Sequence, residues 1–201
     1  MTFRAPQLDW PIRLGGHLWR LTINKRPLNS SRIMQLYPDV ASLDEDLKSR
    51  LLASAQTVNV PNGAFAFRKG DPCKNFILVL EGQVRVQLST ESGREMTLYR
   101  VSQGGTCALT TSCLIGKEEY PAEAVIEKDV TAVMFPDREF RQALLDSEQF
   151  RQFVFQGFSR RLCAIVGRME AVALKTIDER LALHLLDHDR DSIADITHQV
   201  L

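Results

Sequence analysis

The sequence lacks the features that mark several large classes of protein. No apolar run approaches the roughly 18–20 residues that span a bilayer, and no continuous apolar segment follows a basic start, as it would in an export signal. The 201 residues carry 25 basic and 25 acidic side chains, so the net charge is zero and gives no indication of nucleic-acid binding. We therefore expect a cytoplasmic protein with no membrane partner.

Metal-binding and catalytic patterns are also missing. The four cysteines, Cys73, Cys107, Cys113 and Cys163, form no C-x-x-C pair and are not spaced with the four histidines as zinc ligands. We expect free thiols and no metal, with a redox or metal pair of Cys107 and Cys113 as the open alternative. Residues 57–136 contain no histidine, which argues against a metal-dependent β-roll enzyme, and no Ser-His-Asp or phosphate-loop pattern is present. We expect no catalytic residues and no enzymatic activity.

The charge is nevertheless uneven. Residues 1–36 hold six basic side chains against one acidic side chain. Prolines and glycines interrupt this stretch, and Asn29-Ser30-Ser31 is typical of a loop. We expect residues 1–36 to form an irregular basic N-terminal arm, which either contacts an acidic partner or is a solvated tail.

Residues 37–146 are predicted to form a sheet domain with flanking helices. Ser42 and Glu45 make a capping-box pattern before a leucine-rich helix. From Thr57 to Pro136 the pattern changes to short apolar segments separated by glycines, which favours an antiparallel β-roll of the jelly-roll, double-stranded β-helix type. The segments are Val58–Val60, Ala64–Phe67, Phe76–Leu80, Val84–Leu88, Met96–Val101, Ala122–Ile126 and Val130–Phe135. Ser92-Gly93 predicts a hairpin turn.

A long helix is predicted over residues 147–175. Asp137 is expected to cap a preceding helix, and Ser147 to cap the long one. Apolar residues recur along it at intervals of three and four, which is a heptad pattern typical of a dimer interface. They are Phe155, Phe158, Leu162, Ile165, Met169 and Val172. A second apolar set, Phe150, Phe153 and Val154, is expected to pack on the roll. We predict that the heptad residues form the interface of a homodimer; the alternative is that they are buried within one chain.

This order of elements resembles the Crp/Fnr family of bacterial transcription regulators. The similar segments are Leu80–Val86, Gly104–Ala122, Arg138–Leu174 and Thr176–Ala182. The resemblance implies an α+β fold: an effector-sensing β-roll, a dimerisation helix, and over residues 176–201 the start of a winged helix-turn-helix domain, with Ser192 and Thr197 near DNA. It also implies a homodimer that binds DNA through its complete C-terminal domain, and RNA polymerase as a partner.

The family's cyclic-nucleotide cassette is altered here. Leu109 and Ser112 stand where glycines would be, Thr110 where a glutamate would be, and Tyr120-Pro121 where the phosphate-binding arginine and its serine would be. We expect no cyclic AMP binding of the family's usual kind. An unidentified small-molecule effector is expected instead, and no other cofactor. The expected pocket residues are Thr106, Cys107, Leu109, Thr110, Thr111, Ser112, Cys113, Tyr120 and Pro121; the alternative is a pocket filled by its own side chains.

Residues 192–201 resemble the first helix of the helix-turn-helix. The turn and recognition helix do not follow within this sequence, so we expect no sequence-specific DNA binding by these 201 residues alone. The alternative function is a stand-alone sensor module for a small molecule that acts through a protein partner.

Overall fold

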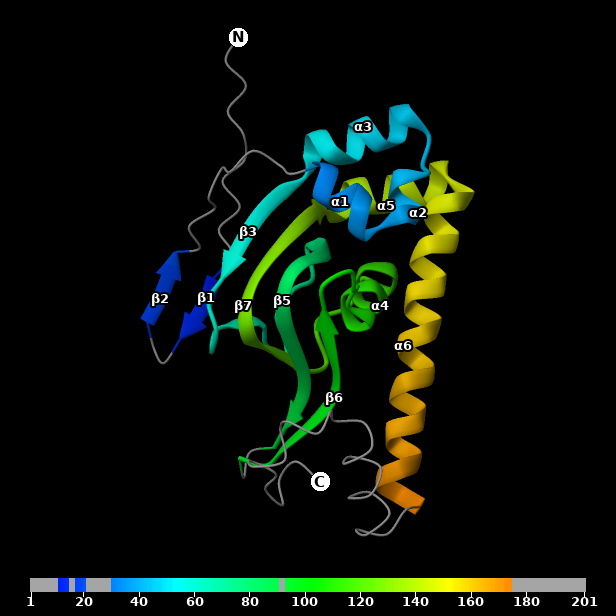
Figure 1. Cartoon of the computed structure of the whole chain (residues 1–201). Helices are drawn as coiled ribbons and strands as arrows, with labels where there is room; N and C mark the ends of the chain where they lie inside the picture. The colour runs from blue at the N-terminus through cyan, green and yellow to red at the C-terminus, as the bar shows by residue number, and fades with distance from the viewer. Residues whose placement is uncertain (1–10, 15–16, 21–29, 91–92, 175–201) are drawn as a thin grey trace. The chain divides into compact units, whose positions relative to one another are not determined.

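A computed structural model describes residues 11–14, 17–20, 30–90 and 93–174 (Figure 1). The chain divides into two compact units, residues 1–161 and 162–201, and the division falls within the last helix. The strands are β1 (Pro11–Leu14), β2 (His17–Arg20), β3 (Gln56–Val60), β4 (Phe65–Phe67), β5 (Asn75–Ser89), β6 (Glu95–Ser102) and β7 (Glu123–Pro136). The helices are α1 (Ser30–Leu36), α2 (Pro38–Ala41), α3 (Glu45–Ser54), α4 (Ala108–Gly116), α5 (Asp137–Asp146) and α6 (Glu148–Leu174).

An antiparallel sheet forms the centre of the first unit. Its strand order is β3-β7-β5-β6, and β4 pairs with β7. Strands β5 and β7 pair along most of their length, from Asn75 opposite Pro136 to Gln87 opposite Glu123. The predicted fold class, an antiparallel roll followed by a long helix, is confirmed (Figure 1). The predicted start of a helix-turn-helix over residues 176–201 lies outside the described residues.

Two long strands, β5 and β7, each replace two of the predicted short segments. In β5 the two segments are continuous because Gly82 does not end the strand. It lies inside β5 with a φ of +88°, where the pairing with β7 shifts register. A Cβ atom at this position would overlap the carbonyl oxygen of Asp129, so only glycine fits. The prediction of a turn at Gly82 was therefore wrong. The hairpin at Gly93 is confirmed, since its N–H donates to the Thr90 carbonyl over 2.9 Å between β5 and β6.

The prediction of an irregular arm over residues 1–36 was wrong at three places. Strands β1 and β2 pair as a hairpin, with Leu14 opposite His17. Their connection in the sequence is Gly15-Gly16, a dipeptide that favours two-residue hairpins. Helix α1 begins at Ser30, where a loop was expected, and its Ile33 is fully buried. Burial of this one apolar face stabilises a helix that is too short to form alone.

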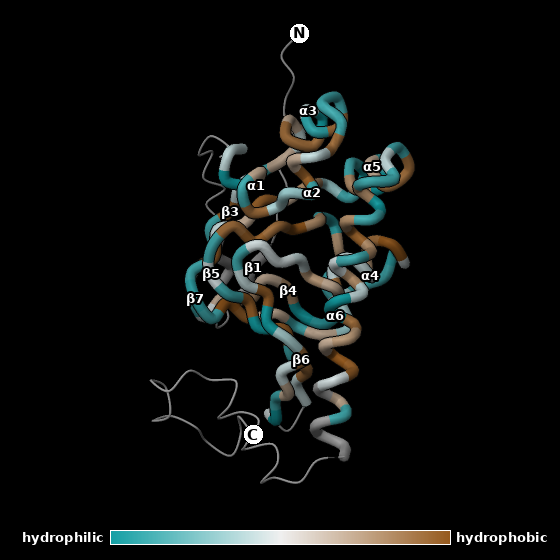
Figure 2. Tube along the Cα trace, turned by 45° about the vertical axis from the view of Figure 1, so that its right-hand side comes forward, coloured by the Kyte–Doolittle hydropathy of each residue, from teal (hydrophilic) through white to brown (hydrophobic). Residues whose placement is uncertain are grey.

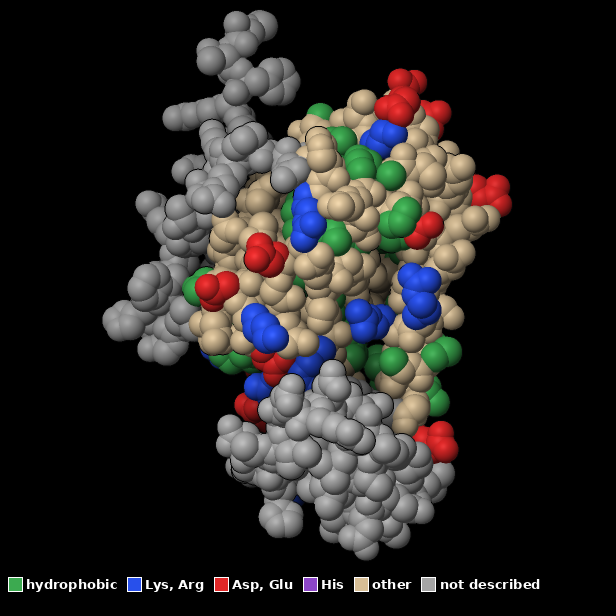
Figure 3. Space-filling model, in the orientation of Figure 1, with side chains coloured by type: hydrophobic (Ala, Val, Ile, Leu, Met, Phe, Trp, Pro, Cys, Tyr) green, Lys and Arg blue, Asp and Glu red, His purple; other side chains and the backbone are tan. Residues whose placement is uncertain are grey.

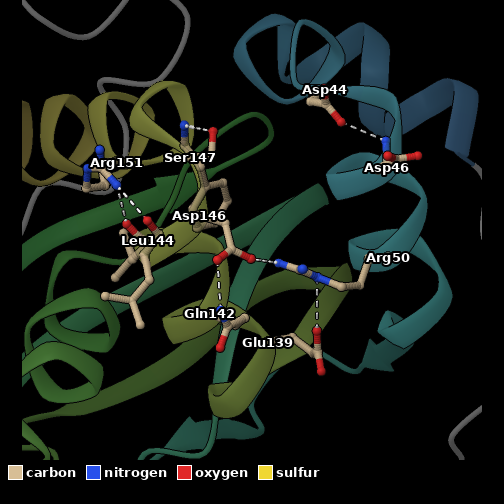
Figure 4. A network of polar contacts seen from close by, with 11 residues as sticks. Asp44, Asp46, Arg50, Glu139, Gln142, Leu144, Asp146, Ser147 and Arg151 are labelled. Carbon is tan, nitrogen blue, oxygen red and sulfur yellow. Dashed lines mark hydrogen bonds and ion pairs between the residues drawn. The ribbon is translucent and has the colours of Figure 1, made fainter.

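Two of the three predicted helix caps also differ from the structure. Asp44, not Ser42, caps α3 by accepting a hydrogen bond from the Asp46 N–H over 2.9 Å (Figure 4). Ser42 instead ends α2, and its hydroxyl donates to the Asp39 carbonyl. Asp137 is the first residue of α5 rather than its cap. The Ser147 cap of α6 is confirmed, because its Oγ accepts from the Phe150 N–H over 3.2 Å.

The helices pack on one face of the sheet around an aromatic core. Its buried side chains come from α1–α3 and the residues that connect them, from β5 and β7, and from α4–α6, and they include Ile33, Tyr37, Leu47, Leu51, Phe76, Val133, Phe140, Phe150 and Phe153. The Phe76 and Phe140 rings stack at 4.6 Å. Helices α3 and α5 are connected by an ion pair, in which Arg50 donates to Asp146 over 2.6 Å (Figure 4). Figure 2 shows hydrophobic and hydrophilic stretches alternating along α3, as expected of a helix with one buried face.

None of the helices in the described part of the chain is long and apolar enough to span a membrane.

Candidate effector site and the α6 surface

Helix α4 carries most of the predicted pocket residues. It begins after Cys107, and its C-cap is Lys117, whose backbone takes the left-handed conformation with a φ of 59°. One side of the helix faces the roll and is buried, through Thr110, Thr111 and Cys113. Ser112 is exposed on the opposite side. The helix thereby directs hydroxyl and thiol groups into the roll.

A cavity of about 60 Å³ lies inside the roll next to α4. Strands β3 to β7 form most of its wall, and α4 closes it with Thr110 and the adjoining Cys107. The described lining residues are Val58, Val60, Ala66, Phe67, Ile77, Val79, Val84, Val101, Cys107, Thr110, Ile126, Val130, Ala132 and Met134. None of these described residues is charged. On β5 the lining residues change from odd to even numbers across the irregularity at Gly82, from Ile77 and Val79 to Val84.

Tyr99 connects the start of α4 to β6. Its ring is buried, and its hydroxyl accepts a hydrogen bond from the Leu109 N–H over 3.1 Å. The same hydroxyl lies 3.4 Å from the Cys107 Sγ. Burial and the neighbouring Cys107 raise the pKa of Tyr99 well above its usual value, so the phenol is neutral at physiological pH. A neutral side chain of the protein thus holds a backbone N–H at the start of this helix.

Tyr120 fills the other side of α4. Its ring stacks on Phe67 with centroids 3.7 Å apart and planes inclined by 7°. Its hydroxyl lies 3.1 Å from the Thr110 hydroxyl and accepts a hydrogen bond from the Cys73 thiol over 3.1 Å. Burial raises the pKa of Cys73 to about 12 and that of Cys113 to about 11. Both thiols are therefore protonated at neutral pH and are poor nucleophiles.

The predicted pocket residues are only partly brought together. Cys107 and Thr110 line the cavity, and Tyr120 is stacked beside it. The Thr111 hydroxyl donates to the Cys107 carbonyl within α4, and the Cys113 thiol donates to the Glu119 carbonyl. Ser112 and Pro121 are exposed, Leu109 is half-buried, and Thr106 faces α6. Of the nine predicted residues, only Cys107 and Thr110 therefore line the cavity.

Sequence reasoning missed twelve of the fourteen described lining residues, and it also missed Tyr99 and Arg161, which contact α4 and β6. Tyr99 shares the inward face of β6 with Val101, and strict alternation along Met96–Val101 indicates this placement. The Arg161 side chain donates to the Arg100 carbonyl over 3.0 Å and lies over the Tyr99 ring at 5.9 Å. No pattern in the sequence distinguishes Arg161 from its exposed neighbour Arg160.

The first turns of α6 are packed on the roll. Phe150, Phe153 and Val154 are buried, as expected. Gly157 faces β-roll residue Thr106, and a Cβ atom at position 157 would lie 3.0 Å from the Thr106 Oγ1. With Arg161, these residues recur at intervals of three and four and form what we call the inner face of α6.

A second set of apolar residues on α6 is exposed. Phe155 is 52% exposed, Leu162 49%, Val166 56% and Met169 59%. We call these four residues the outer stripe, since their spacing of seven, four and three places them on one side of the helix. Hydrophobic side chains are visible along the α6 edge of the molecule (Figure 3). Of the other predicted interface residues, Phe158 and Ile165 are half-buried, and the side chain of Val172 lies outside the described part.

Within the described ranges no three metal-ligating side chains from His, Cys, Asp and Glu come together. Cys73, Cys107, Cys113 and Cys163 are free thiols. The predicted DNA-binding residues Ser192 and Thr197 lie outside the described residues.

Comparisons with known proteins identify the roll. Residues 57–147 match the family described as the cyclic nucleotide-binding domain. The matched residues cover the roll from β3 to the end of α5. A transcriptional regulator of the Crp/Fnr family from Eubacterium rectale has the same fold, with a TM-score of 0.68 and 24% identity, over 76% of this chain and 70% of that chain. The c-di-GMP-responsive global regulator CLP of Xanthomonas campestris follows, with a TM-score of 0.62 and 18% identity, over 77% of this chain and 76% of that chain.

The global nitrogen regulator of Synechococcus elongatus is 24% identical over 129 residues, which cover 64% of this chain and 58% of that protein. The match therefore spans less than two thirds of this curated relative. The expected resemblance to the Crp/Fnr family is confirmed. The roll that matches this family differs from a phosphate site in the chemistry of its cavity, since the described lining residues are aliphatic or aromatic apart from a thioether, a thiol and a hydroxyl.

Proposed function

We propose that this chain is the sensor and dimerisation part of a Crp/Fnr-type transcription regulator. Its named relatives are regulators rather than enzymes. In this proposal two copies associate through α6, and a complete C-terminal domain binds DNA and presents the dimer to RNA polymerase. Such a regulator acts in the cytoplasm, where its DNA is.

The outer stripe of α6 is the observation that carries the dimer. Phe155, Leu162 and Met169 are each about half exposed on one side of a 27-residue helix. Full burial of such a side chain contributes roughly 1.5–3 kcal/mol, so a partner that covers the exposed half contributes about half of this for each residue. A second copy offers the same stripe, and two identical stripes with heptad spacing pack by knobs into holes. The dimer therefore removes the apolar surface that the monomer exposes.

Sedimentation velocity of Leu162→Arg tests the dimer directly. We expect the unchanged chain to sediment as a dimer at micromolar concentration and Leu162→Arg as a monomer, because a buried arginine without a partner prevents association. Leu145→Arg is the matched control, since Leu145 on α5 is 76% exposed and lies outside the stripe. A monomeric unchanged chain, or equal effects of the two variants, would contradict the proposal.

We propose further that the effector is not a cyclic nucleotide. A cyclic phosphate requires a cationic or N–H partner, and burial of its charge without one is costly. The cavity has no charged residue, and the N–H of Leu109 at the start of α4 is bound to Tyr99. Tyr120, at the position of the family's arginine, is stacked on Phe67 and bonded to Thr110.

Calorimetric titration with cyclic AMP and cyclic GMP tests this part. We expect no saturable heat at millimolar nucleotide, with an established cyclic AMP-binding regulator as the positive control in the same buffer. Micromolar binding of either nucleotide would overturn the proposal for the effector. The proposal for the dimer is tested separately, by the sedimentation experiment.

A further inference from the structure

The cavity in the roll has the chemistry of a site for an uncharged ligand. Twelve of its fourteen lining residues carry only hydrocarbon or thioether side chains, and neither of the others, Cys107 and Thr110, is charged. Most of the lining, including Val101, Ile126 and Ala132, is buried. An ion in this cavity would lose its hydration with no compensating charge.

Water is also a poor occupant, because the polar atoms of the lining are already engaged. The Cys107 thiol contacts the Tyr99 hydroxyl at 3.4 Å, and the Thr110 hydroxyl contacts the Tyr120 hydroxyl at 3.1 Å. A buried water needs about two to four polar partners, and apolar cavities without them stay dry. A dry apolar cavity favours an apolar guest.

The volume limits the size of that guest. The cavity of about 60 Å³ is less than half of the roughly 150 Å³ of a hydrocarbon cavity that holds benzene or xenon. An aromatic ring or a nucleotide does not fit without rearrangement, whereas a molecule of a few atoms does. We propose that the roll cavity binds a small, uncharged, apolar molecule of a few atoms, of the size of a dissolved gas.

This ligand class deepens the proposed sensor function and rests on it for its biological meaning. The site lies close to α6 through two contacts, from Cys107 to the Tyr99 hydroxyl and from the Tyr99 ring to the Arg161 guanidinium. A ligand that displaces Cys107 therefore acts on Tyr99. The hydroxyl of Tyr99 bonds the start of α4, and its ring contacts Arg161 on the inner face of α6. An effect on the outer stripe requires a different affinity for two arrangements of these contacts.

Methyl NMR under increasing xenon pressure tests the site, with xenon as an apolar probe. We expect saturable shifts at methyl groups of the cavity, such as those of Val58, Val101 and Ile126. The methyl groups of Leu47 and Leu51 in the helical core provide the internal control and are expected to stay unchanged. Absence of saturation, or equal shifts in both cores, would overturn the inference.

A matched pair of variants on β7 locates the site. Val130 lines the cavity, whereas Val133 packs in the helical core on the other face of the strand. We expect Val130→Ile to weaken xenon binding at least tenfold, because the added methyl occupies part of a small cavity, and Val133→Ile to leave it unchanged. Equal weakening by the two variants would contradict the assignment. A dimer that does not bind xenon overturns this inference alone, and a monomer that binds xenon overturns the proposed dimer alone.

Discussion

The inner face and the outer stripe of α6 are similar in composition and opposite in environment. The inner face is buried against the roll by Phe150, Phe153 and Val154 and is held at its end by Arg161. The outer stripe has an aromatic and aliphatic content of the same kind, yet each of its residues is about half exposed. Burial within one chain therefore accounts for only one of the two apolar sides, and the other side is the one at which the proposed dimer places its partner.

The largest test of this contrast is to truncate one phenylalanine on each side. Phe153→Ala removes a buried ring, and we expect it to lower the free energy of unfolding by about 3–5 kcal/mol. Phe155→Ala removes an exposed ring, and we expect less than about 1 kcal/mol at protein concentrations low enough to dissociate a dimer. Urea unfolding at several concentrations measures both. A Phe155→Ala loss that is as large and independent of concentration would show that the outer stripe is buried within its own chain.

The end of the inner face is tested by two neighbouring arginines. Arg161→Ala leaves the Arg100 carbonyl without its donor and uncovers the Tyr99 ring, so we expect a loss of about 1–2 kcal/mol in the free energy of unfolding. Arg160→Ala is the control, because Arg160 is exposed and adjacent. The Leu109 amide resonance is expected to move in Arg161→Ala only. An unchanged Leu109 amide would separate Arg161 from the α4 site.

Substitution of the two glycines of α6 by alanine is expected to change the free energy of unfolding by smaller amounts, and the two changes are expected to differ. No atom lies within 4 Å of a Cβ placed at Gly167, so Gly167→Ala is expected to raise the free energy of unfolding by roughly 1 kcal/mol through helix propensity. At Gly157 the added Cβ meets the Thr106 hydroxyl oxygen at 3.0 Å, so Gly157→Ala is expected to gain clearly less.

A double-mutant cycle with Thr106→Ala sharpens this comparison. In that background the obstructing hydroxyl is gone, and the gain from Gly157→Ala is expected to rise toward that of Gly167→Ala. If Thr106→Ala does not change the effect of Gly157→Ala, the two residues are not in the contact that defines the inner face.

Periodicity predicted α6 and the buried set Phe150, Phe153 and Val154, but only three of the six residues that it predicted for the second set, Phe155, Leu162 and Met169, belong to the outer stripe. It did not record what covers each set. Arg161 and Gly157 belong to the inner face although neither is apolar, since one donates to a carbonyl and the other admits a hydroxyl. Val166 belongs to the outer stripe but falls outside the strict heptad.

The roll shows the same division between pattern and contact. The alternation of apolar and polar residues predicted its strands, and Ser92-Gly93 predicted the hairpin between β5 and β6. Gly82, however, is required because the backbone of Asp129, 47 positions later in the sequence, lies close to it. The cassette residues of α4 were found from a resemblance, and their pairing with Tyr99, Tyr120 and Cys73 was not. Such pairings depend on three-dimensional register, which local patterns do not contain.

A pH-dependent comparison concerns the cysteines, which differ between the roll and α6. Burial raises the pKa of Cys73 to about 12, while Cys163 on α6 is exposed. A group whose pKa is raised by folding stabilises the protein fully below its unfolded pKa of about 8.5, and this contribution is lost as pH rises toward the folded value. We expect the free energy of unfolding to fall between about pH 8.5 and pH 10, below the range in which unfolded tyrosines titrate. Cys73→Ser is expected to reduce this slope and Cys163→Ser to leave it unchanged, as urea unfolding across the pH range would measure. Equal slopes in the two variants would mean that the thiol beside Tyr120 is no more shielded from water than the thiol on the exposed helix.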